Sequence, residues 1–438
     1  MAISESQHNA LIELLGVEHV SADATVLAQV AVQDVKPACL CVPGSAEQAA
    51  AIIRFAAENK LPVVPYGGGT QQGIGSPPPA DFLALSTRRL TAGFQHEPAD
   101  MVATVPAGMT LGALQEALGK NGQWLPLDGD PQYATLGGLI ATDHSGPRAL
   151  GYGTLRDMVL GMTVVNGDGV IRKCGGKVVK NVTGYALEKL YIGSLGTLGL
   201  VTEVTFKLRP LPIGRDQWTI PVDDIRAGLA TLRAIGDRNL PLEVAQYYDA
   251  AAAFILNLEP HSKTIRSLVL VSATGTDAEL DRIDRELTSA AAPVAAARAK
   301  CDPEATGQDL LLAVASGGGI PALPANDAAS RYVGSLRFWC VPSKAQAAIA
   351  AIPFGDAISL NLRSGTVVVN SYERTENIDR VSSDLAGLGV NFRFENDWRD
   401  QVARPFGPPR NAEWALMKQI KAALDPQGIM NPGRYVTG

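Results

Sequence analysis

One stretch of the chain reads Leu61-Pro62-Val63-Val64-Pro65-Tyr66-Gly67-Gly68-Gly69-Thr70-Gln71-Gln72-Gly73-Ile74-Gly75-Ser76-Pro77. It holds five glycines within nine residues, and it follows a short apolar run typical of a strand. Glycine permits sharp turns and lets a ligand approach the backbone closely. Because the loop contains no Lys or Arg, its donors for an anion would be successive backbone N–H groups. The stretch alone predicts either such an anion site or an ordinary surface turn.

Two common nucleotide-binding motifs do not match this loop. A dinucleotide fingerprint would place its third glycine at Gln72, and prolines 77–79 occupy the place where its helix should begin. A phosphate loop of the NTPase type ends in Gly-Lys-Ser/Thr, whereas Gly73-Ile74-Gly75 supplies neither a lysine nor a hydroxyl.

Composition limits the classes of protein that the chain can represent. Its 438 residues, 46% hydrophobic and 19% charged, predict two or three globular domains. A net charge of −6 argues against non-specific nucleic-acid binding. The five cysteines are scattered without a C-x-x-C pair, which excludes the spacing of a disulfide framework, a zinc site or an iron–sulfur site. Without a signal-like start or a long apolar run, we expect a cytoplasmic protein.

The first half of the chain alternates strand and helix patterns. Ala49, Ile52, Ile53 and Ala56 recur at helical spacing, and Ser45 can cap the helix. The other expected elements are strands at 62–66, 82–86 and 101–105, a helix from Thr110 to Leu118, a hairpin of 159–165 with 170–174, and a strand with one polar face at 200–208. A boundary is expected at 209–212.

The second half predicts a weaker α+β pattern. Strands are expected at 243–247, 268–272, 332–339 and 366–371, and helices at 225–235, 278–290, 344–349 and 377–388. Gly317-Gly318-Gly319 is expected to form a flexible joint. A last helix at 412–424 leads into a turn-rich tail, 425–434, which we expect to be ordered.

Taken together, these landmarks resemble the flavoprotein family of vanillyl-alcohol oxidase and p-cresol methylhydroxylase. The resemblance covers residues 35–212 and the C-terminus, and its motifs are 65–73, 134–142, 152–161, 180–185, 193–203 and 425–434. It implies an α+β fold with a two-part FAD-binding domain, an α+β substrate (cap) domain, and a C-terminal tail that returns to the FAD domain. The expected division is an N-terminal helical segment at 1–34, the FAD-binding domain at 35–212, the cap at 213–410, and the last helix and tail at 411–438.

Within that family, the chain is most similar to the FAD-binding E subunit of bacterial glycolate oxidase. This likeness rests on Ser145-Gly146-Pro147-Arg148, on Arg156-Asp157 and on residues 175–185. About 200 residues between Pro212 and Ala412 carry no specific likeness.

The resemblance implies which residues hold the cofactor. Backbone amides would bind the FAD diphosphate, while other motif residues would line the ribityl chain, the flavin ring and the adenine. The expected cofactor-binding residues are Gly67, Gly68, Gly69, Thr70, Gln71, Thr135, Gly137, Gly138, Thr142, Gly196, Gly199, Val201 and Asn431. Family members with covalent flavin use His or Cys, and residues 67–75 contain neither, so we expect FAD to be bound non-covalently.

Catalytic residues are less well indicated. His144 is the only histidine in the presumed cofactor region, where it would act as a base, as a flavin linkage or as a hydrogen-bonding group. A carboxylate substrate needs an arginine fork. The candidate arginines are Arg148, Arg156, Arg363, Arg393 and Arg404. The second half contains only His261, so we expect no catalytic metal of the kind bound by clustered histidines.

Three hypotheses follow. The first is an FAD-binding subunit of glycolate-oxidase type, which oxidises a small 2-hydroxy acid and acts with a second flavoprotein subunit and an iron–sulfur subunit. The second is a free-standing FAD-dependent alcohol or sugar-alcohol oxidase or dehydrogenase, and the third is a flavin-bearing electron-relay subunit. In the first case, any contact with the inner membrane would be made through the partners.

Overall fold

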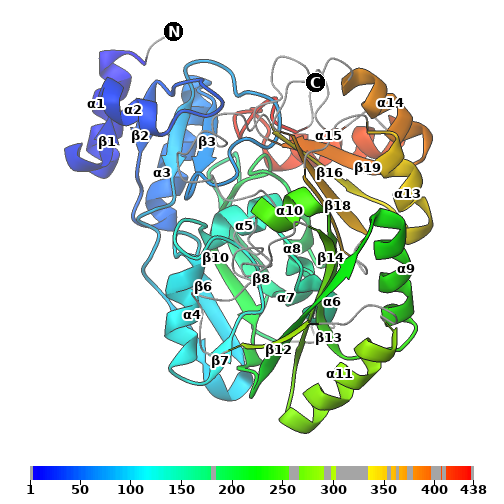
Figure 1. Ribbon diagram of the computed structural model, residues 1–438. Helices are drawn as coiled ribbons and strands as arrows, with labels where there is room; N and C mark the ends of the chain where they lie inside the picture. The colour runs from blue at the N-terminus through cyan, green and yellow to red at the C-terminus, as the bar shows by residue number, and fades with distance from the viewer. Residues whose placement is uncertain are drawn as a thin grey trace.

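The structure is a computed structural model that contains helices and sheets in both halves of the chain (Figure 1). It describes residues 3–178, 184–255, 266–290, 297–301, 334–352, 357–361, 365–371, 378–395, 406 and 411–435. Sheets of four, five and two strands occupy the first half, and an eight-stranded sheet occupies the second. This arrangement confirms the predicted α+β class. The expected joint at Gly317-Gly318-Gly319 lies outside the described residues.

The first sheet has the strand order β1-β2-β4-β3, and its last three strands are parallel. The elements of this region are α1 (Glu5–Leu15), β1 (Val20–Ser21), α2 (Ala24–Gln29), β2 (Cys39–Cys41), α3 (Ala46–Asn59), β3 (Val63–Tyr66) and β4 (Leu83–Ser86). Helix α3 begins as predicted, because the hydroxyl of Ser45 accepts a hydrogen bond from the backbone of Gln48. Its buried face includes Ile52 and Ile53, so the helix covers the sheet.

The second sheet is antiparallel, with the order β5-β6-β10-β8-β9. Its strands are β5 (Gln95–Glu97), β6 (Val102–Pro106), β8 (Val159–Val165), β9 (Ile171–Gly175) and β10 (Leu200–Lys207), with helices α4 (Leu111–Gly119) and α5 (Leu136–Thr142). The predicted β8–β9 hairpin is confirmed. Because β10 is the central strand, its polar face is largely covered. Thr205 is buried there and shares a 2.9 Å hydrogen bond with Thr104.

Short elements lie between the longer helices and strands of the first half. They are η1 (Val17–His19), η2 (Pro98–Asp100), β7 (Gln123–Trp124), α6 (Ala149–Tyr152), α7 (Leu155–Met158), α8 (Glu188–Tyr191) and β11 (Arg209–Pro210). Strands β7 and β11 form the two-stranded sheet.

The second half is built around an antiparallel sheet with the order β15-β12-β14-β13-β17-β18-β16-β19. Its strands are β12 (Arg215–Val222), β13 (Leu242–Tyr248), β14 (Ser267–Thr274), β15 (Ala297–Cys301), β16 (Gly334–Trp339), β17 (Ala357–Asn361), β18 (Thr366–Ser371) and β19 (Asn391–Glu395). Its helices are α9 (Ile225–Gly236), α10 (Ala250–Ile255), α11 (Asp277–Ala290), α13 (Pro342–Ala350) and α14 (Ile378–Gly387). Sequence patterns missed β12, β15, β17, β19 and α10.

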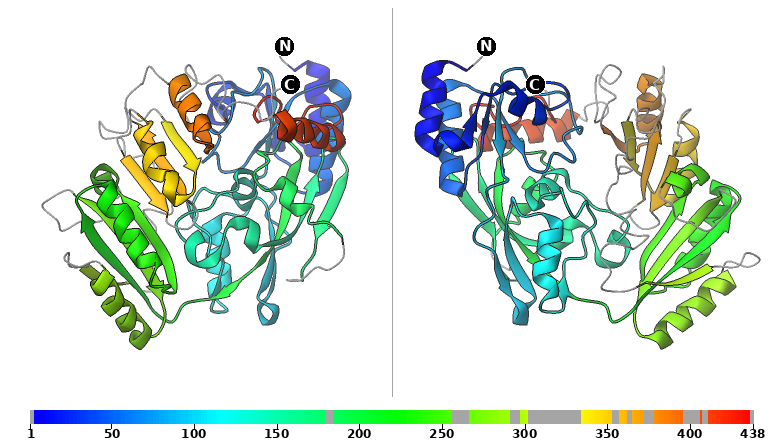
Figure 2. Two further views of the ribbon diagram at one scale, coloured as in Figure 1. Left: turned by 90° about the vertical axis from the view of Figure 1, so that its right-hand side faces the viewer. Right: turned by 60° about the vertical axis from the view of Figure 1, so that its left-hand side comes forward.

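Figure 2 shows the two halves as separate lobes joined near α6 and β13. Helices α9, α11, α13 and α14 cover the outer face of the large sheet (Figure 1). The chain passes from one lobe to the other between β11 and β12, and we propose a domain boundary there. No helix among the described residues combines the length and apolar character needed to cross a bilayer.

The C-terminal segment returns to the first lobe. Helix α15 (Asn411–Leu424) precedes a tail that runs parallel to β3, where Met430 pairs with Val63. The backbone of Val63 donates to Ile429 at 2.8 Å, and the backbone of Asn431 donates to Val63 at 2.7 Å. The tail is therefore an ordered edge of the first sheet, next to the glycine loop.

Candidate functional site

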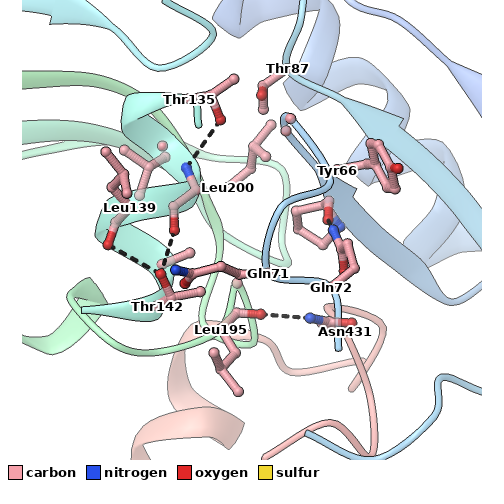
Figure 3. A pocket seen from close by; sticks show the side chains of 18 of the residues that line it. Tyr66, Gln71, Gln72, Thr87, Thr135, Leu139, Thr142, Leu195, Leu200 and Asn431 are labelled. Carbon is pink, nitrogen blue, oxygen red and sulfur yellow. Dashed lines mark hydrogen bonds between the residues drawn. The ribbon is translucent and has the colours of Figure 1, made fainter. Parts of the chain in front are cut away.

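A cleft opens where the glycine loop after β3 faces helix α5. Its other walls are the turn before β10 and the C-terminal tail (Figure 3). In Figure 3, Gln72 of the loop lies across the cleft from Leu139 of α5, while the Gln71 side chain extends toward Thr142 at the end of that helix. Segments that are distant in the sequence therefore form one site.

The glycine loop is fastened by its neighbours. The side-chain amide of Gln33 donates to the carbonyls of Gly73 at 3.0 Å and Gly75 at 2.7 Å. Gln72 turns back and donates to the carbonyl of Pro65 at 3.0 Å. The loop is thus held in one shape by side-chain bonds to its carbonyls.

Helix α5 forms the opposite wall. Thr135 caps it by accepting a hydrogen bond from the backbone of Gly138, and Thr142 donates to the carbonyl of Gly138 at 2.9 Å. Gly137 lets this helix lie against β6, because a Cβ there would be 2.9 Å from the Cβ of Ala107. A Cβ at Gly138 would meet only the Thr135 hydroxyl, at 3.2 Å. Gly137 thus serves packing, whereas Gly138 leaves space on the cleft side.

The tail closes the cleft at one end. The Asn431 side chain donates to the carbonyl of Leu195 at 2.5 Å, and Asn431 itself is buried. Both residues line the cleft. The tail therefore joins the turn before β10 directly to the first sheet.

The structure brings together every cofactor-binding residue expected from the sequence. All of them line this single cleft, namely Gly67, Gly68, Gly69, Thr70, Gln71, Thr135, Gly137, Gly138, Thr142, Gly196, Gly199, Val201 and Asn431. Further lining residues that the sequence did not single out include Tyr66, Gln72, Thr87, Leu139, Ser194, Leu200 and Arg434.

Arg434 is the most informative of these additions. Its side chain is 2% exposed, and its guanidinium donates to the carbonyls of Ser76 and Gln72, each at 2.7 Å. In the described part of the chain no carboxylate pairs with it, and its Nε has no hydrogen-bond partner. Burial lowers the pKa of Arg434 to about 10. The residue ends the tail motif quoted above, but its sequence position did not show that it reaches the glycine loop.

This cleft fits an anionic nucleotide cofactor. A buried cation without a counter-charge is unfavourable, and a diphosphate would supply that charge. The loop backbone adds donors that no side chain blocks, since a nest of amides favours phosphate oxygens. The residues present therefore suit the diphosphate of FAD.

His144 lies beside the cleft. Its ring is 3% exposed, and its Nδ1 is 2.6 Å from the side-chain nitrogen of Gln71. The preceding residue, Asp143, ends α5 in the left-handed region, and burial raises the pKa of its carboxyl against the opposing influence of Arg156 and Arg393. The loop and the end of α5 are therefore coupled through His144.

The candidate arginines have different surroundings. Arg148 does not line the cleft; it is buried, and it forms ion pairs with Asp128 at 2.9 Å and with Glu243 of β13 at 3.4 Å. Arg156 donates to the carbonyl of Lys189 on the surface. Arg393 of β19 donates to the carbonyl of Thr142 at 3.3 Å, which places it at the edge of the cleft.

The remaining predicted residues, Arg363, Arg404 and His261, lie outside the described residues. Among the residues that are described, no group of three His, Cys, Asp or Glu side chains could hold a metal ion.

Two family models match the chain. The model of the FAD binding domain matches residues 37–175, and the model of the C-terminal domain of FAD linked oxidases matches residues 406–435. These segments contribute the glycine loop, α5 and the tail to the cleft. The chain is an FAD-linked oxidoreductase. This confirms FAD as the cofactor and the flavoprotein resemblance inferred from the motifs.

Curated relatives agree with this assignment. The chain is 29% identical over 408 residues to a D-lactate dehydrogenase of Archaeoglobus fulgidus, covering 90% of each protein. It is 25% identical over 436 residues to glycolate oxidase subunit GlcD of Bacillus subtilis, covering 91% of this chain and 88% of that protein. Glycolate oxidase subunit GlcE of Escherichia coli is 33% identical over 198 residues, which is 44% of this chain and 52% of that protein. The resemblance to the E subunit is therefore shared with relatives that align over more of this FAD-linked oxidoreductase.

A solved structure confirms the predicted fold. p-Cresol methylhydroxylase with substrate bound superposes with a TM-score of 0.73 at 16% sequence identity, covering 99% of this chain and 97% of that protein. The FAD-linked oxidoreductase thus has the fold of p-cresol methylhydroxylase.

Proposed function

We propose that this chain is an FAD-dependent dehydrogenase of 2-hydroxy acids and a subunit of a glycolate-oxidase-type complex. The observation that carries the proposal is the position of Arg393. This residue lies on β19 of the eight-stranded sheet, and its side chain reaches Thr142 at the edge of the cofactor cleft. A guanidinium is the preferred partner of a carboxylate in such a site. Relatives named D-lactate dehydrogenase and glycolate oxidase subunit act on acids of this kind by name.

In this proposal the cofactor lies along the cleft with its diphosphate against the loop and Arg434. Amides of Gly67 to Gln71 would donate to the phosphate oxygens, and Arg434 would balance their charge. The flavin-ring end of the cofactor would lie toward Thr142 and Asn431, and the adenine end toward Leu200 and Val201 at the start of β10. When bound, FAD would supply a hydride acceptor for C2 of the acid. The hydroxyl proton would pass to a base of the chain, so that the 2-hydroxy acid becomes a 2-oxo acid.

The chain supplies the remaining groups. Arg393 would fix the carboxylate and so orient C2 toward the cleft. We propose His144 as the proton acceptor. Its buried Nδ1 accepts a hydrogen bond from the side-chain amide of the cleft residue Gln71, and the substrate hydroxyl would take the place of that amide. The eight-stranded sheet and the C-terminal tail would exclude water from the flavin-ring end of the cleft.

Electrons must then leave the chain. Because its cysteines are scattered, we propose that a second flavoprotein subunit and an iron–sulfur subunit receive them. Two relatives are named as glycolate oxidase subunits, which supports assembly with partners. We propose that this assembly is cytoplasmic.

The test is anaerobic reduction of the bound flavin. The purified FAD-loaded chain is mixed with 2-hydroxy acids and with simple alcohols, and the flavin absorbance is followed. Bleaching by a 2-hydroxy acid, with alcohols inert, supports the proposal. Bleaching by alcohols alone favours a free-standing alcohol oxidase, whereas no bleaching even with the partner subunits present contradicts the proposed reaction.

A further inference from the structure

A second cavity adjoins the cofactor cleft on the cap side. It measures about 480 Å³ and lies between the ends of β16 and β19, helix α15 and the turn at Gly193–Leu195. Leu195 lines both this cavity and the cofactor cleft. Arg393 lines the cavity and bonds to Thr142 of the cleft, so the two spaces meet at these residues.

Aromatic side chains form much of the cavity wall. Trp339 ends β16, Trp414 lies on α15, and Phe406 and Tyr435 pack edge to face with ring centres 4.6 Å apart. The guanidinium of Arg393 lies 5.4 Å from the ring centre of Trp339. Such stacking restrains the arginine beside an aromatic wall, while Asn391 and Glu413 add polar groups to the same cavity.

We propose that this cavity receives the side chain of the substrate, which is a 2-hydroxy acid with an aromatic or similarly bulky apolar group. The inference rests on the proposed function and names its substrate class. Arg393 would bind the carboxylate at the junction of the two spaces, C2 would face the cofactor cleft, and the side chain would enter the aromatic cavity. The carboxylate would thereby meet a guanidinium, and the apolar side chain would meet the aromatic wall.

The volume of the cavity favours a substrate larger than the smallest 2-hydroxy acids. A cavity of about 480 Å³ has the size of an ordinary small-molecule site, roughly 300–1,000 Å³. Glycolate has no side chain beyond the hydroxyl-bearing carbon, so it would leave the aromatic wall facing water. A single methylene in an apolar pocket changes specificity by roughly 10–200-fold, so a phenyl group is expected to raise kcat/KM by at least about 100-fold over glycolate.

A graded substrate series tests the inference. FAD-loaded protein, with partner subunits if reduction requires them, is mixed anaerobically with both enantiomers of lactate, 2-hydroxyisovalerate and 3-phenyllactate, and with glycolate. The second-order rate constant of flavin reduction should rise from glycolate through lactate and 2-hydroxyisovalerate to 3-phenyllactate. Glycolate or lactate matching or exceeding 3-phenyllactate would overturn the inference.

Variants connect the preference to the cavity. Trp414→Ala should weaken 3-phenyllactate binding by about tenfold or more and affect glycolate binding much less. Met417→Trp, which fills the cavity from the same helix, should reduce the phenyllactate rate selectively. Leu416→Ala is the matched control, because Leu416 lies on α15, is 57% exposed and does not line the cavity. Equal effects on both acids would contradict the assignment.

A binding measurement separates the two proposals. Calorimetric titration of the FAD-loaded protein with 3-phenyllactate and with glycolate needs no turnover. If no acid reduces the flavin but 3-phenyllactate binds with dependence on Trp414, the proposed reaction fails and the cavity assignment is retained. If 3-phenyllactate does not bind, the cavity assignment itself is wrong.

Discussion

Gly68 lies directly against the backbone of Tyr133, and a Cβ atom at Gly68 would be 1.7 Å from the Tyr133 carbonyl oxygen. The glycine loop and the segment before α5 are therefore in contact without room for any side chain between them. The absence of a side chain at Gly68 is required by the packing of the chain against itself, in addition to any approach by the cofactor.

Gly68→Val should therefore lower the stability of the protein even without FAD. Relieving the overlap requires a backbone shift in one of the two loops, and overpacking of this kind costs about 1–3 kcal/mol. Thermal unfolding of the cofactor-free variant measures the effect. An unchanged melting temperature would show that the loops separate freely and that their contact is unimportant.

Gly138→Leu is expected to behave differently. A side chain at Gly138 has space on the cleft side, so the variant should fold but lose FAD. Gly119→Leu is the matched control, since Gly119 ends α4 with no atom near its Cβ position and does not line the cleft. Fluorescence titration should show FAD binding to the control and at least about tenfold weaker binding to Gly138→Leu. Equal binding by both would contradict the placement of the cofactor beside Gly138.

Local patterns predicted the elements that depend on neighbours in the sequence. Helix α3 has its cap at Ser45 and its apolar face at helical spacing, so its first turn and its buried face were predicted correctly. Strand β12 was missed because Arg215, Asp216 and Gln217 form a polar run, although all of them are buried. Arg215 and Asp216 tolerate burial through ion pairs with Glu243 and Arg298, which lie far along the chain and carry no local signal.

The same reasoning explains how much of the site could be predicted. The cofactor-binding residues were expected from the family resemblance, whose motifs are carried by short local segments, and all of them line the cleft. Arg434 was not chosen because its role depends on contact with residues 72–76, which only the folded chain brings near it. The aromatic cavity was missed likewise, since its walls come from β16, β19 and α15.

Arg434→Gln should weaken FAD binding more than it affects folding. A charge-assisted hydrogen bond contributes about 1.5–3 kcal/mol, so the dissociation constant for FAD should rise by roughly 10–150-fold. Riboflavin, which lacks phosphate, should bind the variant and the original protein equally. Fluorescence titration with both ligands provides the comparison.

The matched control for this arginine is Arg54→Gln. Arg54 also donates to a backbone carbonyl, that of Gly169 at 2.8 Å, but it does not line the cleft. The Arg54→Gln substitution should leave the affinity for FAD unchanged. If Arg434→Gln weakens riboflavin binding as much as FAD binding, its side chain supports the shape of the cleft and does not act on the diphosphate.

Glu243→Gln should destabilise the contact between the lobes. The Glu243 carboxylate binds Arg215 at 3.0 Å and Arg148 at 3.4 Å, and all three side chains are buried. Removing one partner of a buried ion pair costs about 3–5 kcal/mol. Glu286→Gln is the control, because it breaks an exposed 2.6 Å pair with Arg238 that contributes at most about 1 kcal/mol. Urea unfolding curves of the two variants measure the difference, and similar losses would contradict the importance of the buried network.

Lys421→Met should accelerate the release of FAD. The Lys421 ammonium on α15 donates to the carbonyls of Thr197 at 2.6 Å and Met430 at 2.7 Å and pairs with buried Asp425. It therefore ties the tail, which contributes Asn431 and Arg434 to the cleft, to the turn before β10. Without it, Asp425 is left as a buried charge and the tail should open more often.

The dissociation rate of FAD should rise by about tenfold or more. A loss of about 1.4 kcal/mol in the free energy that holds the tail closed over the cleft already corresponds to a factor of ten. Displacement of FAD by an excess of a fluorescent analogue measures this rate. Lys418→Met serves as the control, because Lys418 is exposed on the same helix and lines neither cavity. If Lys421→Met releases FAD at the original rate while limited proteolysis shows a loosened tail, the tail does not close the cofactor site.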